Sequence, residues 1–206
     1  MTGDIHSRSP RAYSEAMSHA ITDYPRRHRL SVDDYYRMAE IGILAADQRV
    51  ELIDGEIIDM PPPGTLHAAT VHRLIGIFVH AVGDGAIALV QNPVRLTEYS
   101  EPQPDLALLR PREDFYAQHH PRPADVLLIV EIAATSLRYD RETKRPLYAA
   151  HEIPEFWLVD LAGKRLVRHR APQRSAYTQV DEPELTRVLE ISELPGVAVD
   201  LSRLFG

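Results

Sequence analysis

The stretch DVLLIVEIAATS, residues 125–136, places one acid inside an apolar run. Val126–Val130 are all apolar, and a short run of this kind predicts a strand that is buried on both faces. Glu131 continues the run, and Ile132 follows it. An unpaired carboxylate at the edge of a core is costly or undergoes a large pKa shift. The stretch therefore predicts a central strand, together with a partner that compensates Glu131.

A second acid occupies a similar position in PDLALLR, residues 104–110. Asp105 opens an apolar strand that one loop separates from the first, so we expect the two strands to be neighbours. Two carboxylates on adjacent strands repel each other unless a cation neutralises them. Because the donors are oxygen atoms and the chain has no cysteine, the preferred ion is Mg²⁺ or Mn²⁺. Asp105 and Glu131 are thus predicted metal ligands.

The segment SLRYDRETKRPLYAAH, residues 136–151, predicts a helix that can bring a lysine to this site. Asp140, Lys144 and Tyr148 are spaced i, i+4 and i+8, so they share one helical face. Lys144 is one of only two lysines among 23 basic residues, which indicates a role that arginine does not serve. If the helix packs on the sheet, the ammonium can stabilise charge on a reacting phosphate.

Each of these residues also has a purely structural interpretation, because ion-pair networks place charges near cores as well. Glu131 can pair with a core arginine, Asp105 can cap its strand, and Lys144 can form a surface pair with Asp140. It is the combination of the three that describes a metal site.

Length and composition predict one ordinary domain with its own core. The chain has 206 residues, 44% of them hydrophobic, and no cysteine, which excludes disulfides and thiolate metal sites. The formal net charge of −7 excludes a fold-wide basic field for nucleic acid, although a local basic cleft is compatible with it. We expect no membrane span and no signal peptide, and hence a cytoplasmic protein.

The order of predicted elements indicates an α/β or α+β domain around a mixed central sheet. Residues 1–28 are expected to be a mobile N-terminal extension, followed by a single domain over 29–206. Pro146 is expected to shift or kink the first turn of its helix. The expected elements are a helix over 31–42, a hairpin around Asp54–Gly55, a helix over 66–82, strands over 86–91, 93–98, 104–110 and 125–134, a helix over 136–150, a hairpin around Ala162–Gly163, and short strands to the end.

Several motifs together resemble one known family. RVELIDGEII (49–58), His67 in the following helix, QPDLALL (103–109), VEIAATS (130–136) and YDRETKRPLYAAHEIPEFWLVD (139–160) are similar to the Uma-type family of restriction-endonuclease-like proteins. That family belongs to the PD-(D/E)XK nuclease superfamily, and the resemblance covers about residues 30–205. The last block is its most specific part. Where the family commonly has Ser-Pro-Ser-Thr after the glutamate, this chain has AATS.

The resemblance implies a restriction-endonuclease-like core, a divalent metal and phosphodiester hydrolysis. The superfamily's acidic pair corresponds to Asp105 and Glu131, and the backbone carbonyl of Ile132 is an expected further ligand. The usual lysine position holds Ala133, so Lys144 is expected to take that role from the helix. Further residues that the resemblance or the helical face implies are Glu51 as an extra acid near the metal, and His67, Gln103, Asp140 and Tyr148 as pocket residues.

The function expected from these residues is that of a Mg²⁺- or Mn²⁺-dependent endonuclease that cleaves DNA with a metal-activated water. A homodimer is also expected, both from the family and because EFWLVD (155–160) and the terminal strands are more apolar than one small sheet requires. Two alternatives stay open. One is a catalytically silent nucleic-acid-binding or regulatory protein on the same fold, and the other is a hydrolase for another phosphate substrate.

Overall fold

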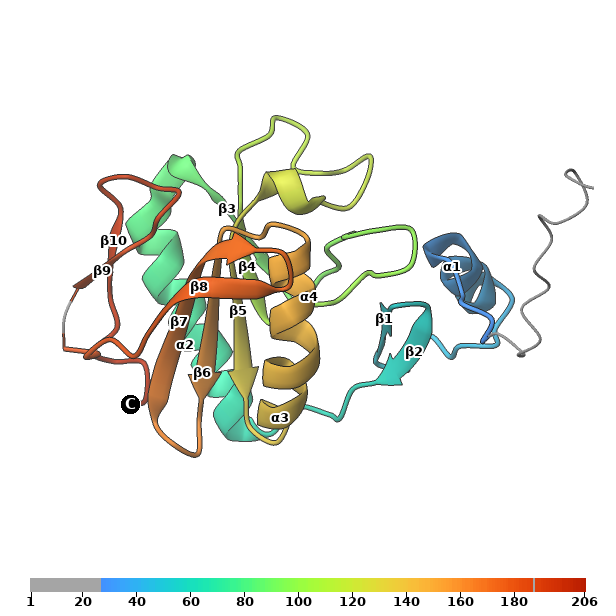
Figure 1. Ribbon diagram of the computed structural model, residues 1–206, viewed down its shortest axis with the longest axis horizontal. Helices are drawn as coiled ribbons and strands as arrows, with labels where there is room; N and C mark the ends of the chain where they lie inside the picture. Colours follow the sequence, from blue (N-terminus) through green and yellow to red (C-terminus); the bar gives the residue numbers. More distant parts are fainter. Residues whose placement is uncertain (1–26, 187) are drawn as a thin grey trace, which may run out of the picture.

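A six-stranded mixed sheet forms the centre of the protein (Figure 1). The computed structural model describes residues 27–186 and 188–206. Neighbouring strands are antiparallel except for β5 and β6, which run parallel. The strand order is β3 (Ile87–Val90), β4 (Leu106–Leu109), β5 (Val126–Ala133), β6 (Glu155–Asp160), β7 (Arg165–Gln173) and β8 (Ala176–Asp181).

The strand β5 is central and buried along its whole length, as its apolar run predicts. Successive side chains of a strand point to opposite faces of a sheet. Leu128 and Val130 accordingly join the core on one face, whereas Ile129 and Ala133 join the core on the other. Glu131 has the same parity as Ile129 and Ala133. The pleat of β5 therefore directs Glu131 to the second face, where the helix that carries Lys144 packs.

The first face of the sheet is covered by α2 (Thr65–Val82) and by the two-stranded ribbon of β9 (Val188–Glu190) and β10 (Ala198–Asp200) (Figure 1). By length and composition alone, the segment Thr65–Gly85 could cross a membrane, so the expectation of no such segment was too strict. Buried helices of folded domains pass the same test. One face of α2 does pack in the core, through Leu74 and Phe78.

The second face is covered by a helix with an irregular middle turn. It consists of α3 (Leu137–Tyr139), the π-helical turn η3 (Asp140–Lys144) and α4 (Arg145–Ala150). Pro146 has no N–H, and in a regular helix its ring would clash with the carbonyl four residues earlier. The wider π turn directly before Pro146 relieves that clash, and the N–H of Arg145 bonds to the carbonyl of Asp140. The predicted shift at Pro146 is therefore present, as a π turn.

The remaining elements form an N-terminal arm, residues 30–60, set beside the sheet (Figure 1). It contains α1 (Val32–Glu40) and the hairpin of β1 (Val50–Ile53) and β2 (Glu56–Asp59). Ser31 and Asp34 form the predicted capping box, and Asp54 and Gly55 have the positive φ values of a tight hairpin turn. The arm is fastened by the segment 98–103, as in the bond from the N–H of Glu101 to the carbonyl of Leu52.

The predicted fold class is confirmed, with one wrong element. Residues 93–98 were expected to form a strand, but they form an irregular segment. The N–H of Val94 bonds to Pro102, that of Arg95 to Pro121, and that of Leu96 to Ser100, so no ladder with one neighbour develops. Two 3-10 turns, η1 (Gly83–Gly85) and η2 (Pro123–Asp125), lie in loops. Residues 1–26 of the expected N-terminal extension lie outside the described residues.

Candidate active site

A pocket of about 720 Å³ lies between the N-terminal arm and the C-terminal end of β5. The arm contributes one wall, and the other comes from the start of α2, the start of β4, the end of β5 and the helix around η3. Its lining residues include all three predicted catalytic residues, Asp105, Glu131 and Lys144. Glu51, His67, Gln103, Ile132 and Asp140, which were also predicted at the site, line the same pocket.

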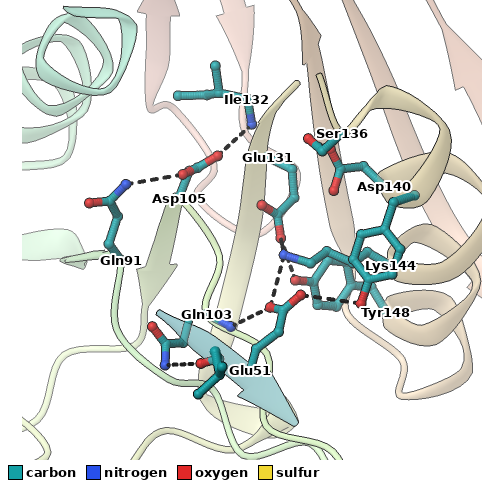
Figure 2. A network of polar contacts seen from close by, with 12 residues as sticks. Glu51, Gln91, Gln103, Asp105, Glu131, Ile132, Ser136, Asp140, Lys144 and Tyr148 are labelled. Carbon is teal, nitrogen blue, oxygen red and sulfur yellow. Dashed lines mark hydrogen bonds and ion pairs between the residues drawn. The ribbon is translucent and has the colours of Figure 1, made fainter. Parts of the chain in front are cut away.

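Glu131 is compensated by two side chains of the neighbouring helix (Figure 2). The ammonium of Lys144 donates to Glu131 Oε1 at 3.0 Å, and the hydroxyl of Tyr148 donates to the same oxygen at 2.6 Å. Glu131 is 3% exposed and Lys144 is 4% exposed, so this pair is removed from water. The partner that the apolar run of β5 required is therefore Lys144, and no arginine pairs with Glu131 within the described chain.

A second carboxylate reaches the same ammonium from the arm. Glu51 Oε2 lies 3.1 Å from Lys144 Nζ, and Glu51 is 1% exposed. The backbone N–H of Gln103 donates to Glu51 Oε2 and the hydroxyl of Tyr139 donates to Oε1. The side chain of Gln103 bonds to the carbonyl of Val50, so it fixes the strand rather than facing a ligand. Lys144 thus joins the arm to the central strand.

Burial and charge displace the pKa values of this cluster from their ordinary positions. Burial raises the pKa of Glu131 to about 8, against the opposing charge of Lys144. Burial alone would lower the pKa of Lys144, but the neighbouring carboxylates, Glu131 first, raise it above its usual value. Burial also raises the pKa of Asp140, whose carboxylate accepts a hydrogen bond of 2.6 Å from Ser136. Before a cation binds, Glu131 therefore retains its proton near neutral pH.

Asp105 has a different environment, directly before β4. Its carboxylate accepts hydrogen bonds from the N–H of Ile132 at 2.8 Å and from the side chain of Gln91 at 3.3 Å (Figure 2). His67 Nε2 lies 3.0 Å from it. Burial acts to raise the pKa of Asp105, but the hydrogen bonds from His67 and the Ile132 N–H, together with the charges of His67 and Lys144, outweigh it, and the pKa is lowered. The environment therefore lowers the pKa of Asp105 but raises the pKa of Glu131.

The donor set suits a hard divalent cation. Asp105 and Glu131 supply carboxylate oxygens, and both donors to Glu131 bind Oε1, leaving Oε2 without a hydrogen bond from the described residues. The N–H and C=O of one strand residue point to the same side, and the N–H of Ile132 points to Asp105. The carbonyl of Ile132 therefore faces the acid pair as well.

The described part of the chain does not hold three side chains arranged together as metal ligands. Within residues 27–186 and 188–206, no group of three or more His, Asp or Glu side chains is arranged to hold a metal ion. Mg²⁺, however, keeps several waters and commonly uses one or two carboxylates together with substrate phosphates. Two carboxylates and one carbonyl meet that requirement. Glu51 is less available, because both of its oxygens already have donors: Lys144 and the Gln103 N–H at Oε2, and Tyr139 at Oε1.

Sequence reasoning missed three residues at the site: Gln91, Ser136 and Tyr139. Gln91 ends the apolar run of β3, and its N–H bonds to the carbonyl of Asp105. A polar residue at the end of a strand adjacent to Asp105 was an available signal, but it required the strand order. Tyr139 has no comparable signal, because its contact with Glu51 joins residues 88 positions apart.

The fold is of the restriction-endonuclease-like class, and the comparisons with known proteins agree. Residues 32–202 match the Uma2 family, described as "Putative restriction endonuclease", and the chain belongs to that family. A solved structure with a similar fold is "a putative nuclease belonging to DUF820" from Anabaena variabilis ATCC 29413, with a TM-score of 0.64 and 18% sequence identity. The match covers 85% of this chain and 97% of that one. No curated protein sequence matches.

Proposed function

We propose that the protein is a nuclease that uses a divalent cation, Mg²⁺ or Mn²⁺, to hydrolyse phosphodiester bonds of DNA. One observation carries this proposal. Carboxylates from three separate elements, Glu51, Asp105 and Glu131, converge on one pocket together with a lysine whose Nζ lies 3.0 Å from Glu131 and 3.1 Å from Glu51. A surface ion pair would be exposed to water, whereas these groups are recessed in a cavity large enough for a substrate group.

Asp105, Glu131 and the carbonyl of Ile132 would hold the cation. When bound there, a divalent cation supplies a Lewis acid for the phosphate and lowers the pKa of an adjacent water. The hydrogen bonds to Asp105 from Gln91 and Ile132 orient its carboxylate. The hydrogen bonds to Glu131 Oε1 leave Glu131 Oε2 available to bind the cation. Hydrogen bonds to ligating carboxylates fix the direction in which these ligands face the cation.

Lys144 has a separate task. An ammonium has three N–H donors, and Glu131 and Glu51 accept two of them. Since Lys144 lines the pocket, the third donor is available to a phosphate oxygen or to the attacking water. A fixed ammonium in a cavity with little water stabilises developing negative charge without having to reorient. Glu51 and Glu131 position the lysine, and Tyr148 in turn positions Glu131.

A cleavage assay with purified protein tests the proposal. Linear and supercoiled double-stranded DNA, single-stranded DNA and RNA are incubated with Mg²⁺, Mn²⁺ or EDTA, and products are separated on denaturing gels. The expected result is cleavage of DNA with either ion and none with EDTA. Glu131→Ala and Asp105→Asn should each lower the rate by about 10² or more, because each removes a donor that binds the cation.

The matched control is Lys164→Met, in the exposed turn between β6 and β7, which should cleave as the wild type does. Wild-type protein that binds DNA but never cleaves it would instead favour the silent binding protein. Equal cleavage by wild type and Glu131→Ala would show that a different site or a contaminant is responsible.

A further inference from the structure

Besides the catalytic cluster, the pocket contains a second basic residue, on the arm side. Arg49 directly precedes β1, and the bond from the N–H of Met60 to its carbonyl continues the hairpin ladder. Residues two apart on a strand point to the same side. Glu51 points into the pocket, where it pairs with Lys144, so the side chain of Arg49 is directed to the same side. Arg49 does line the pocket, and it is half-buried.

The charges around Arg49 make its pairing unusual. Besides His67, the described lining contains two basic residues, Arg49 and Lys144. The acidic residues in the same lining are Glu51, Asp59, Asp105, Glu131 and Asp140. An arginine in such surroundings would be expected to bind a carboxylate with its planar fork.

Arg49 forms no ion pair with a carboxylate of residues 27–186 or 188–206. Its one side-chain hydrogen bond there is donated by Nη1 to the carbonyl of Pro61, at 3.3 Å. The acids are engaged elsewhere: Glu51 and Glu131 by Lys144, Asp105 by His67, and Asp59 by the side chain of Gln48. The guanidinium therefore retains most of its five donors on the wall of a cavity whose other cation is already neutralised.

We propose that Arg49 is a phosphate-binding residue, which holds a phosphate group of the nucleic-acid strand in the pocket. This inference rests on the proposed function. The reason is electrostatic: a phosphodiester that enters an acid-rich cavity needs cations, and Lys144 is shared between two carboxylates. A guanidinium presents two parallel N–H donors that match two phosphate oxygens. Because Arg49 contacts a phosphate that is bound before and during the reaction, its removal weakens binding more than turnover.

The test compares Arg49→Gln with wild type in nucleic-acid binding. A fluorescein-labelled 24-nucleotide single strand and the corresponding duplex are titrated with full-length protein in Ca²⁺, and anisotropy is recorded between 50 and 200 mM KCl. We expect Arg49→Gln to bind about 10-fold more weakly, as for loss of one charge-assisted hydrogen bond. The salt dependence of log K should become less steep by about 0.9 on the duplex or about 0.7 on the single strand, as for one lost phosphate contact.

Two variants make the result specific. Arg49→Lys keeps the positive charge but lacks the two parallel N–H donors of a guanidinium, so it should retain the salt dependence and lose part of the affinity. Arg174→Gln removes an exposed arginine in the turn between β7 and β8, outside the pocket, and should bind as the wild type does. In a Mg²⁺ cleavage assay, Arg49→Gln should raise KM about 10-fold and change kcat by less than about 3-fold.

The outcomes separate this inference from the proposed function. Wild-type protein that binds but does not cleave would contradict the nuclease proposal, while the Arg49 variants would still report on phosphate binding. Arg49→Gln with wild-type affinity and wild-type salt dependence would overturn the inference and leave the nuclease proposal standing. Absence of any binding by wild type would overturn both.

Discussion

Replacement of Lys144 by methionine tests the buried cluster at its centre. The methionine has a similar length but no charge, so it leaves Glu131 and Glu51 buried without their shared cation. From the sequence alone this substitution was expected to leave folding nearly intact, because an unbranched apolar side chain of similar length replaces the lysine. The structure changes that expectation, because Lys144 is 4% exposed and bridges two carboxylates that are each at most 3% exposed.

The expected cost depends on pH. Removal of one partner of a buried ion pair typically destabilises by about 3 to 5 kcal/mol. The pKa of Glu131 is already raised to about 8 by burial, and without Lys144 it rises further. Below the unfolded-state pKa of 4.5, Glu131 is neutral in both states and needs no cation. Up to about pH 8, Glu131 is protonated in the folded state of both proteins, so the part of the stability loss in Lys144→Met that Glu131 causes should be small at pH 5 and 7. It should grow above pH 8, where Glu131 ionises beside Lys144 in the wild type but stays protonated in the variant.

Urea unfolding of wild type and Lys144→Met at pH 5, 7 and 9 measures this difference. The double variant Lys144→Met/Glu131→Gln should recover part of the lost stability at pH 9, because it removes the acid that must stay protonated. A difference that is below about 0.5 kcal/mol at every pH would refute the reasoning, since exposed pairs behave in that way. Cleavage in Mg²⁺ should fall by about 10² or more, whereas Lys164→Met should cleave normally.

Four further results are expected. Tyr148→Phe should lower the free energy of unfolding in urea by about 1 to 2 kcal/mol, because it removes the 2.6 Å hydrogen bond to Glu131 Oε1, which keeps its bond from Lys144. An unchanged unfolding midpoint would contradict this prediction. The Mg²⁺ concentration for half-maximal cleavage should fall as the pH rises toward 8, since Glu131 must ionise to bind the ion; a pH-independent value would exclude Glu131 as a ligand. Burial lowers the pKa of His169 to about 4, so the unfolded state takes up a proton before the folded state does as the pH falls below 6.5. Between pH 6.5 and 4, the free energy of unfolding of wild type should therefore fall by up to about 3 kcal/mol more than that of His169→Gln. Parallel acid-unfolding curves for the two proteins would contradict this prediction. Finally, a homodimer is still predicted from the family, and light scattering that yields only the 23.3 kDa monomer at micromolar concentration would oppose it.

The apolar residues of EFWLVD do not require a partner chain to cover them. EFWLVD forms β6, and all six of its residues, including the four apolar ones, are buried inside the single chain. Trp157 packs against Phe78 of α2, and its indole N–H donates to Glu155. The apolar content of this strand is therefore accounted for by its central position in the sheet, between β5 and β7.

Local signals predicted the elements well where the physical cause is local. The capping box at Ser31, the turn at Asp54–Gly55 and the apolar run of β5 each depend on residues close in sequence, and each is present. The irregular course of 93–98 was missed because its hydrogen bonds go to Ser100, Pro102 and Pro121, which no local pattern reveals.

The site was predictable in its charged residues and less so in its geometry. Acids within apolar strands and a rare lysine pointed to Asp105, Glu131 and Lys144, which line one pocket. The resemblance added Glu51, but its ion pair with Lys144 joins the arm to the helix and depends on how the chain folds back. The position of Arg49 on the pocket wall likewise follows from the pleat of β1, once Glu51 is known to point inward.

Manganese binding tests the central claim most directly, because it asks whether the oxygen donors around Asp105 and Glu131 form a cation site. Free Mn²⁺ is followed by electron paramagnetic resonance during titration at pH 8.5, with wild type, Asp105→Asn, Glu131→Gln and Lys164→Met. We predict one strong site per chain in wild type and Lys164→Met, and about 10-fold or greater weakening in the other two variants. Equal Mn²⁺ binding by all four proteins, or none by wild type, would contradict the proposed metal site.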